Sequence, residues 1–442
     1  MEHPIERRDP ISGHWPAARD SGRRVFAHYM VGLTCDQQPE HWAHDIGAAK
    51  VAGIDGFALN VGSSDHWTST QLDHAYGAAE DSGGFSLFLS FDMAAGCWSV
   101  PQVADLINRY QGSSAQMMVD GRPLVSTFEG PDWASNWPAV RNETGGICLI
   151  PDWSSLGPHG VGQRLDLIDG AFSWDAWPKP AQSKMTTVED LLYKDNLQGK
   201  KYMMGVSPWF YTGKSNPNII LGRFPTPAKP GPDLPQWNKN WYCSSESLWH
   251  DRWKQVLEVM PDFVQIITWN DFGESSYICD ASPAQVVKGA EKYVSGHSHT
   301  AFRAVLPYFI AAYKSGSAEI DWRGQDTAIA WYRTVPVRAQ GHNGTVWGQG
   351  GTVSAAHGAR DVVSVLAVTK GLACITIAIG DSRRVTFETT GRNPVSYFEL
   401  PFDQHATGPV SLALNGRTAI GPEINAWCGH GKASLNAVAI HI

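Results

Sequence analysis

The chain lacks the features of a membrane protein or a nucleic-acid-binding protein. No stretch of its 442 residues approaches the 18 or so consecutive apolar residues that a membrane-spanning helix requires. Lysine and arginine total 35 against 43 aspartates and glutamates, so the net charge is −8 and there is no basic excess to neutralise phosphates. We therefore expect neither a membrane nor a nucleic acid as a partner.

Cysteine is sparse and has no metal-ligand spacing. The seven cysteines are scattered, no C-x-x-C pair occurs, and the H-E-x-x-H motif is absent. His41 and His44 form an H-x-x-H pair, but it falls on a predicted outer helix and not at a strand end. We therefore expect no metal and no other cofactor.

Tryptophan is unusually frequent, with 19 copies. Flat aromatic faces can stack against the apolar C–H faces of sugar rings, and aromatic side chains also fill cores because they bury a large area. The count fits both uses equally. Placement relative to the ends of strands has to distinguish them.

Short apolar runs rich in β-formers recur along the chain, each followed by a helical pattern or a polar loop. They span residues 25–32, 54–62, 85–93, 122–130, 147–153, 168–177, 201–210 and 263–274. Intervening segments carry apolar residues at helical spacing, at 41–53, 70–84, 99–111 and 247–260. Eight strand–helix units predict an α/β fold of the (β/α)8 barrel type, whose active site lies at the carboxyl ends of the strands.

The pattern changes after a predicted helix at 300–316. Alternating runs divided by turn residues follow at 326–337, 361–371, 373–381 and 383–391. They predict a C-terminal antiparallel β-sandwich. We expect two domains, a catalytic barrel over 1–314 and a β-sandwich over 315–442, with a long Pro-, Asn- and Gly-rich loop at 213–245.

Carboxylates gather at the predicted strand ends. They are Asp65, Asp92, Glu129, Asp152, Asp175, Asp271 and Glu274. Cleavage of a glycosidic bond requires one carboxyl that protonates the leaving oxygen and a second that acts as base or nucleophile. Asp271 and Glu274 are the best pair, because the Phe272-Gly273 turn between them aims both side chains into one cleft. The same spacing also fits a helix N-cap followed by a first-turn glutamate.

Seven motifs follow one another in order at 26–32, 55–62, 87–93, 124–130, 170–178, 209–211 and 267–278, and an eighth lies in the tail at 330–337. Together they resemble the motifs of fungal α-1,3-glucanases, the mutanases of glycoside hydrolase family 71. The resemblance covers essentially the whole barrel. It implies an inverting endo-hydrolase of α-1,3-glucan with a catalytic barrel and a C-terminal β-sandwich.

The resemblance also assigns roles to three carboxylates. Asp271 and Glu274 match the essential pair of the W-N-D-x-x-E segment, and Asp92 matches the carboxylate of S-F-D-M. We assign Glu274 as general acid and Asp271 as general base. Asp92 is expected to hold a sugar hydroxyl or to tune the pair, and its alternative is to bind backbone amides only.

Other polar and aromatic residues at the strand ends are predicted to bind substrate. They are His28, Asn60, Asp65, Glu129, Asp152, Trp153, Trp174, Asp175, Trp177, Trp209, Tyr211, Trp269 and Asn270. The alternative for His28 is a satisfied histidine in the core, and some of the aromatic residues must simply cap the barrel.

The expected partner is α-1,3-glucan, as polysaccharide or oligosaccharide, bound by a monomer. Two rival functions stay open, a hydrolase of another α-linked glycan and a carbohydrate-binding wall protein without turnover. The first 25 residues lack the apolar run of a secretory signal. We expect a secreted or cell-wall-associated protein whose signal is not present in this chain, and an intracellular location stays open.

Overall fold

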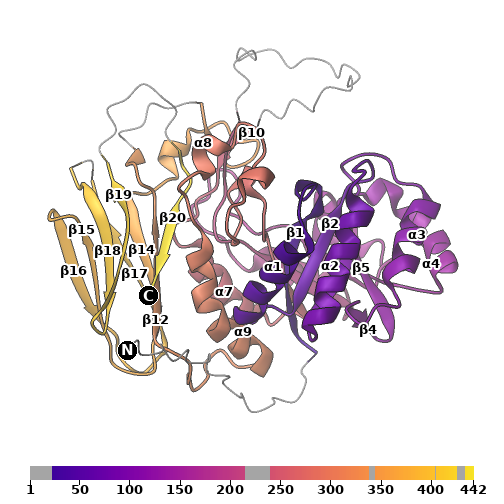
Figure 1. Cartoon of the computed structure of the whole chain (residues 1–442), viewed down its shortest axis with the longest axis horizontal. Coiled ribbons are helices and arrows are strands. Elements are labelled where there is room, and N and C mark those ends of the chain that lie inside the picture. The colour runs from indigo at the N-terminus through magenta and orange to yellow at the C-terminus, as the bar shows by residue number, and fades with distance from the viewer. Residues whose placement is uncertain (1–21, 215–238, 338–343, 404, 426–433) are drawn as a thin grey trace, which may run out of the picture.

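The chain forms a curled parallel sheet surrounded by helices, followed by antiparallel sheets (Figure 1). The computed structural model describes residues 22–214, 239–337, 344–403, 405–425 and 434–442. Most of the predicted loop at 213–245 lies outside the described residues. The predicted mixed α/β class is confirmed.

Each of the eight predicted runs contains one parallel strand. The strands are β1 (Arg24–Met30), β2 (Gly56–Val61), β3 (Ser86–Asp92), β5 (Arg122–Phe128), β6 (Cys148–Leu149), β7 (Gly170–Ser173), β8 (Lys201–Val206) and β11 (Phe263–Ile266). Their order is β5-β3-β2-β1-β11-β8-β7, and β6 pairs with the free side of β5. Beyond β6, Asp152 makes isolated parallel bridges to Phe128 of β5 and Phe172 of β7. The short strand β4 (Met118–Val119) pairs antiparallel with β5.

Helices follow most of these strands, as the apolar spacing predicts. They are α1 (Pro39–Val51), α2 (Thr68–Ser82), α3 (Val100–Tyr110), α4 (Trp137–Thr144), α5 (Gly157–Gly162), α6 (Val188–Asn196), α7 (Leu248–Val259), α8 (Glu291–Val294) and α9 (Leu306–Ser315). Helix α3 shows why such segments fold: Ser99 and Gln102 form a capping box at its start, and Val103 and Ile107 bury one face.

The side chains inside the curled sheet form an apolar layer, and polar side chains follow it toward the carboxyl ends of the strands. Each of the eight parallel strands, or the residue just beyond it, contributes to one buried cluster that includes Phe26, Phe88 and Phe172. Because strand side chains alternate between faces, the residues two positions further on point the same way. They are polar in several strands, for example His28 and Ser90. This alternation brings polar groups to the carboxyl ends of the strands.

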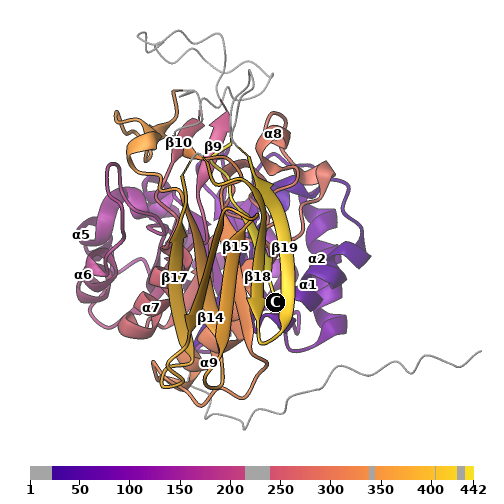
Figure 2. The ribbon, with the colours of Figure 1, turned by 90° about the vertical axis from the view of Figure 1, so that its left-hand side faces the viewer.

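Two antiparallel sheets form the C-terminal part of the chain and lie in front of the helices in Figure 2, where one sheet overlaps the other in the view. One has the order β17-β14-β12-β20 and the other β16-β15-β18-β19. The strands are β12 (Thr327–Tyr332), β14 (Val362–Val368), β15 (Cys374–Ile379), β16 (Arg383–Glu388), β17 (Val395–Pro401), β18 (Gly408–Leu414), β19 (Arg417–Ile424) and β20 (Val438–His441). Buried residues of both sheets form a single cluster, to which β12, β14, β15 and β18 contribute.

The two parts of the chain also share a core. The cluster between the parallel sheet and its helices extends to Ile329 and Trp331 of β12 and to Leu366 of β14. A small third sheet joins β9 (Tyr211–Lys214), β10 (Lys239–Tyr242) and β13 (Val346–Trp347) in the order β13-β10-β9. Because β13 belongs to the C-terminal part, this sheet is a second connection between them.

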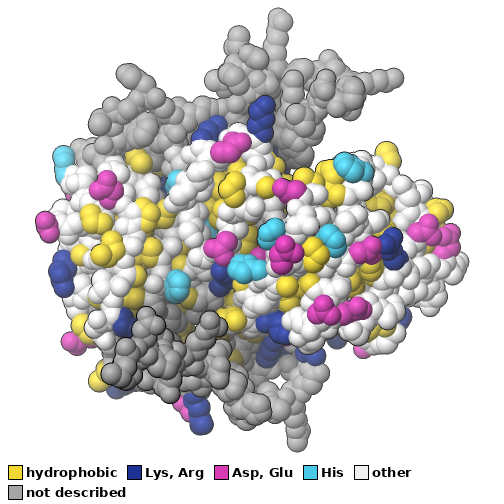
Figure 3. Space-filling view, viewed as in Figure 1, with side chains coloured by type: hydrophobic (Ala, Val, Ile, Leu, Met, Phe, Trp, Pro, Cys, Tyr) yellow, Lys and Arg dark blue, Asp and Glu magenta, His cyan; other side chains and the backbone are white. Residues whose placement is uncertain are grey.

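The surface carries mixed polarity. On the face shown in Figure 3, acidic and histidine side chains gather over the region of α1 and α2, and hydrophobic side chains are scattered among polar ones. Among the described helices, none has both the length and the apolar character needed to cross a membrane.

Candidate active site

A single tight turn after β11 carries the two carboxylates that the sequence singles out. Asp271 precedes the 3-10 turn η4 (Phe272–Glu274) and accepts a hydrogen bond from the backbone N–H of Glu274 at 3.0 Å. The N–H of Asp271 donates to Thr268 Oγ1 at 2.8 Å. Asp271 therefore does cap the turn, and the same cap directs Glu274, whose side chain is 16% exposed, toward a cavity.

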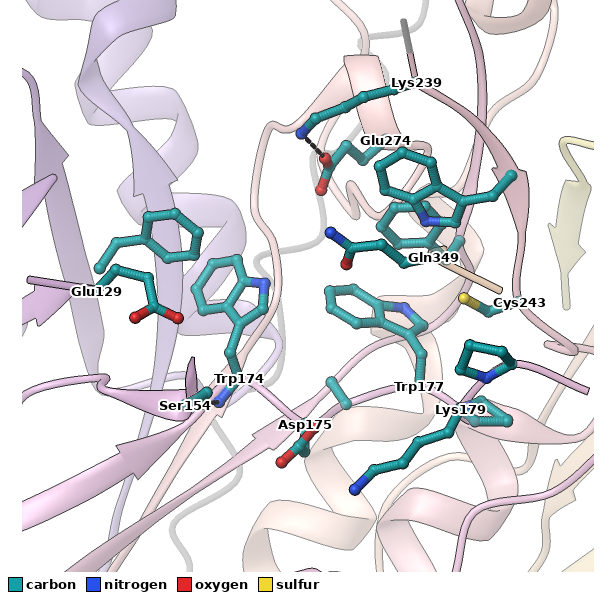
Figure 4. Close-up of a pocket in the computed structure, with 16 residues that line it drawn as sticks. Glu129, Ser154, Trp174, Asp175, Trp177, Lys179, Lys239, Cys243, Glu274 and Gln349 are labelled. Atoms are coloured by element: carbon teal, nitrogen blue, oxygen red, sulfur yellow. Dashed lines mark hydrogen bonds and ion pairs between the residues drawn. The ribbon is translucent and has the colours of Figure 1, made fainter. Parts of the chain in front are cut away.

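Lys239 at the start of β10 contacts this turn directly. Its Nζ lies 2.6 Å from Oε1 of Glu274, the ion pair drawn in Figure 4. Burial opposes the charge of this lysine, but the pKa of Lys239 is raised because Glu274 binds the ammonium. The charges of Asp271 and Asp92 act on the lysine in the same direction. We call Lys239, Asp92, Asp271 and Glu274 the lysine cluster.

Asp92 is the last residue of β3, and it makes the contacts expected of a carboxylate that binds backbone amides. Its Oδ1 accepts from the N–H groups of Ala94 at 3.1 Å and Ala95 at 2.9 Å. Burial nevertheless raises the pKa of Asp92, and the neighbouring charge of Asp65 adds to the effect. Asp65 also has a raised pKa through burial. A Cβ at Gly62 would lie 2.9 Å from Oδ2 of Asp65, so a larger residue there would require the carboxylate to shift.

A second group of carboxylates, which we call the β6 cluster, consists of Glu129, Asp152 and Asp175. Asp152 is fully buried and accepts from the N–H of Ser154 at 3.0 Å. Burial, with the like charges of Glu129 and Asp175, raises the pKa of Asp152 to about 8. Asp152 is therefore protonated at neutral pH. Burial also raises the pKa of Asp175.

Glu129 faces the cavity from a strained position. Its φ is +55°, a left-handed conformation that is uncommon for residues other than glycine. The carboxylate accepts from the N–H of Ser155 at 3.0 Å and from the Ser155 hydroxyl. Figure 4 shows Glu129 and Glu274 on different sides of the cavity, with Trp174 between them.

The cavity between the two clusters has a volume of about 480 Å³ and aromatic walls. It is lined by Phe128, Glu129, Ser154, Trp174, Asp175, Ala176, Trp177, Pro178, Lys179, Pro180, Phe210, Lys239, Trp241, Cys243, Glu274 and Gln349. Trp174 and Trp177 are held edge to face at 6.4 Å, and the rings of Phe210 and Trp241 stack at 5.7 Å. Flat apolar faces and carboxylates thus share one space.

Five of the sequence-predicted site residues line this cavity directly. They are Glu129, Trp174, Asp175, Trp177 and Glu274. Asp271 and Asp92 interact electrostatically with the cavity residue Lys239, and Asp65 interacts in the same way with Asp92. Asp152 interacts with the cavity residues Glu129 and Asp175.

The remaining predicted substrate-binding residues are at most 4% exposed. They are His28, Asn60, Trp153, Trp209, Tyr211, Trp269 and Asn270. His28 bonds to Gln265 at 2.9 Å, and burial lowers its pKa to about 3, so the ring is neutral. Asn270 accepts from the N–H of Met30 at 2.7 Å and thereby fixes the segment before Asp271 to β1. Burial favours a packing role for this group, and its contact with substrate stays a prediction.

Several cavity residues are not predicted from the sequence, among them Lys239, Trp241 and Gln349. Lys239 and Trp241 follow a Pro- and Asn-rich segment without periodicity, and Gln349 lies in a glycine-rich turn of the C-terminal part. Only the tryptophan carries a signal, because an aromatic residue beside a predicted functional loop is a candidate for stacking. Within the described ranges, no group of three or more His, Cys, Asp or Glu side chains could hold a metal ion.

Carboxylates on two sides of an aromatic-walled cavity, at the carboxyl ends of parallel strands, are the arrangement that glycoside hydrolysis requires. The sequence model of glycosyl hydrolase family 71 matches residues 21–441. The chain belongs to this family.

Named relatives cover most of the chain. The glucan endo-1,3-alpha-glucosidase agn1 of Schizosaccharomyces pombe is 33% identical over 424 residues, which is 92% of each chain. Mutanase Pc12g07500 of Penicillium rubens is 35% identical over 84% of this chain and 78% of its own. The ascus wall endo-1,3-alpha-glucanase of Schizosaccharomyces pombe is 27% identical over 90% of this chain and 91% of its own.

Proposed function

We propose that this chain is an endo-acting α-1,3-glucan hydrolase that cleaves internal α-1,3-glucosidic bonds of fungal cell-wall or related glucan. Two relatives that are 33% and 35% identical carry the names glucan endo-1,3-alpha-glucosidase and mutanase. The observation that carries the proposal is the turn after β11, where Asp271 caps the segment that presents Glu274 to an aromatic-walled cavity.

In the proposed mechanism Glu274 protonates the leaving glycosidic oxygen while Asp271 removes a proton from the attacking water. Inversion places the two carboxyl groups roughly 6.5–9.5 Å apart, with room for that water. The Lys239 ammonium lies 2.6 Å from Oε1 of Glu274, so it can hydrogen-bond to the carboxyl group that we assign as the acid. Asp92, which also interacts with Lys239, holds a sugar hydroxyl or tunes the pair.

The architecture we propose is a (β/α)8 barrel over 1–314 and a β-sandwich over 315–442. The bridges of Asp152 to both β5 and β7 support closure of the barrel, and the cluster shared by the two antiparallel sheets supports the sandwich. Helix α9 ends at Ser315 and β12 begins at Thr327, which supports the boundary. We propose a monomer that needs neither metal nor cofactor and acts at the cell wall or outside the cell.

The test is to incubate the chain with glucans of single defined linkage, namely α-1,3, α-1,4, α-1,6 and β-1,3. We expect new reducing ends from α-1,3-glucan, a rapid fall in polymer length, and products whose anomeric configuration is inverted in proton NMR. Preferential cleavage of another α-glucan would favour the first rival. Binding of α-1,3-glucan without any reducing sugar released would favour a binding protein.

A further inference from the structure

Part of the cavity wall comes from the C-terminal region. Strand β13 pairs in parallel with β10, with Val346 opposite Trp241 and Trp347 opposite Tyr242. The turn after β13 brings Gln349 to the cavity. Figure 4 shows the Gln349 side chain between Glu274 and Trp177.

This turn is held in place by close packing on the barrel side. The N–H of Gly348 donates to the Tyr242 carbonyl at 2.8 Å. Gly348 has a φ of +84°, and a Cβ there would lie 2.5 Å from Cα of Pro180, another cavity residue. The indole N–H of Trp347 donates to Ser244 Oγ at 3.0 Å. These contacts fix the position of the turn that carries Gln349.

A buried ion pair fixes the C-terminal region to the same strand. Arg333 beside β12 donates to Oε1 of Glu246 at 2.6 Å, and the two side chains are 1% and 3% exposed. The hydroxyl of Tyr242 on β10 donates to the same oxygen at 2.6 Å. Separating such a pair would leave a buried charge without its partner, which is strongly unfavourable. The C-terminal region and β10 therefore hold one geometry.

We propose that the C-terminal region supplies part of the substrate-binding surface, with the Gln349 amide hydrogen-bonding a sugar hydroxyl of the bound glucan. This inference rests on the proposed function. A glutamine amide offers two donor hydrogens and an acceptor oxygen, which suits a hydroxyl that both donates and accepts. Trp177 and Trp241 line the same cavity with aromatic rings that can stack against a sugar, and the exposed Gln349 amide could then reach a hydroxyl at the edge of that sugar.

The experiment compares Gln349→Ala with the wild type on α-1,3-gluco-oligosaccharides. One net hydrogen bond corresponds to a KM raised roughly three- to tenfold with kcat nearly unchanged. With a series of monodeoxy oligosaccharides, one member should abolish the difference between variant and wild type. Gln163→Ala is the matched control, since Gln163 is exposed at the end of α5 and its amide contacts His159. The control should keep the wild-type KM.

Three results would overturn the inference, and they differ from one another. An unchanged KM in Gln349→Ala, while the wild type cleaves α-1,3-glucan, rejects the inference and leaves the proposed function standing. A lowered unfolding temperature with loss of kcat on every substrate means that Gln349 only supports the wall. Wild-type protein that leaves α-1,3-glucan intact rejects the proposed function and this inference with it.

Discussion

The lysine cluster and the β6 cluster hold the same kind of acid in opposite electrostatic settings. Glu274 has the Lys239 ammonium at 2.6 Å. Asp152 is fully buried among like charges, and its pKa is raised to about 8. Carboxylates at the ends of strands of one sheet can therefore have very different electrostatic surroundings. A strand end identifies a candidate acid, and its surroundings decide what it does.

The largest effect is expected from removing a carboxylate of the lysine cluster. Glu274→Gln should lower kcat by about 10²–10⁴-fold, because an amide keeps the contact with Lys239 but cannot deliver a proton. Asp271→Asn should be comparably inactive, since an amide cannot act as the base. Reducing-sugar assays measure both.

Stability is the control for these variants. Asparagine at position 271 can still accept the hydrogen bond from the Glu274 N–H, so the unfolding temperature should stay close to that of the wild type. More than about a tenth of wild-type activity in either variant would contradict its role. A covalent glycosyl adduct on Asp271 in mass spectrometry would mean retention instead of inversion.

The β6 cluster should instead govern how stability depends on pH. The pKa of Asp152 is about 8 in the folded chain and near 4 in an unfolded one, so the folded state holds this proton more tightly. The contribution is fully present below about pH 4 and is lost as the pH rises toward 8, by at most ~1.4 kcal/mol per pH unit.

Asp152→Asn removes this titration and keeps an acceptor for Ser154. Its unfolding free energy should therefore fall less than that of the wild type between pH 5 and pH 8, as measured by denaturant titration at each pH. Parallel curves for the two proteins would show that Asp152 is already ionised in the folded state, and the contrast between the clusters would disappear.

Lys239→Met should have an intermediate effect and would identify the acid. The ion pair is partly exposed, with side chains 29% and 16% accessible, so we expect a modest shift of one limb of the kcat/KM profile. Removing the ammonium takes away a positive charge that lies 2.6 Å from a carboxyl group of the pair. If the carboxyl beside Lys239 is the acid, the alkaline limb moves to higher pH.

The acidic limb gives the opposite answer. Because the charge of Asp271 also acts on Lys239, a smaller movement of that limb is compatible with Asp271 as the base. Movement of the acidic limb alone would place the base beside Lys239 at Glu274 and reverse our assignment. Lys50→Met, on the outer helix α1, is the control for loss of a lysine, because its ammonium bonds only to Ser82 and to the Gly83 carbonyl among the contacts found. Its profile should match the wild type.

Local patterns in the sequence predict the strands and the acids of both clusters. Alternation places Asp92 and Glu129 at strand ends, and the Phe272-Gly273 turn places Glu274 beside Asp271. The sequence cannot show that Lys239, after a segment without periodicity, turns back onto Glu274. Nor can it show that Gln349 reaches the cavity, since that depends on the pairing of β13 with β10.

A strand pattern also does not predict how deeply the side chains after a strand are buried. Trp174 and Trp269 both follow strands, yet Trp174 lines the cavity and Trp269 is fully buried. The difference arises because the chain turns back after Trp269, whose carbonyl accepts from the N–H of Ile278 at 3.0 Å. Such long loops decide which aromatic faces stay open.

The smallest effect is expected from Glu129→Gln, which tests whether the β6 cluster behaves as one electrostatic unit. The variant keeps the size of the side chain and an oxygen that accepts from the Ser155 N–H, so the left-handed turn at φ +55° should persist. Burial is the main cause of the raised pKa of Asp152, and the charge of Glu129 is a smaller one. Removing that charge should lower the pKa of Asp152 by a few tenths of a unit, which is ~0.5 kcal/mol. The decline in stability should then end at a slightly lower pH than in the wild type, while turnover of α-1,3-glucan falls less than about tenfold, because Glu129 transfers no proton in the proposed mechanism. Denaturant unfolding at half-unit steps from pH 6 to pH 9 measures the first effect, with Asp73→Asn on helix α2 as a remote control for loss of one charge. If the unfolding free energy of the variant declines over the same pH range as that of the wild type, the charge of Glu129 does not act on Asp152. If turnover falls as much as in Glu274→Gln, Glu129 and not Glu274 is the general acid.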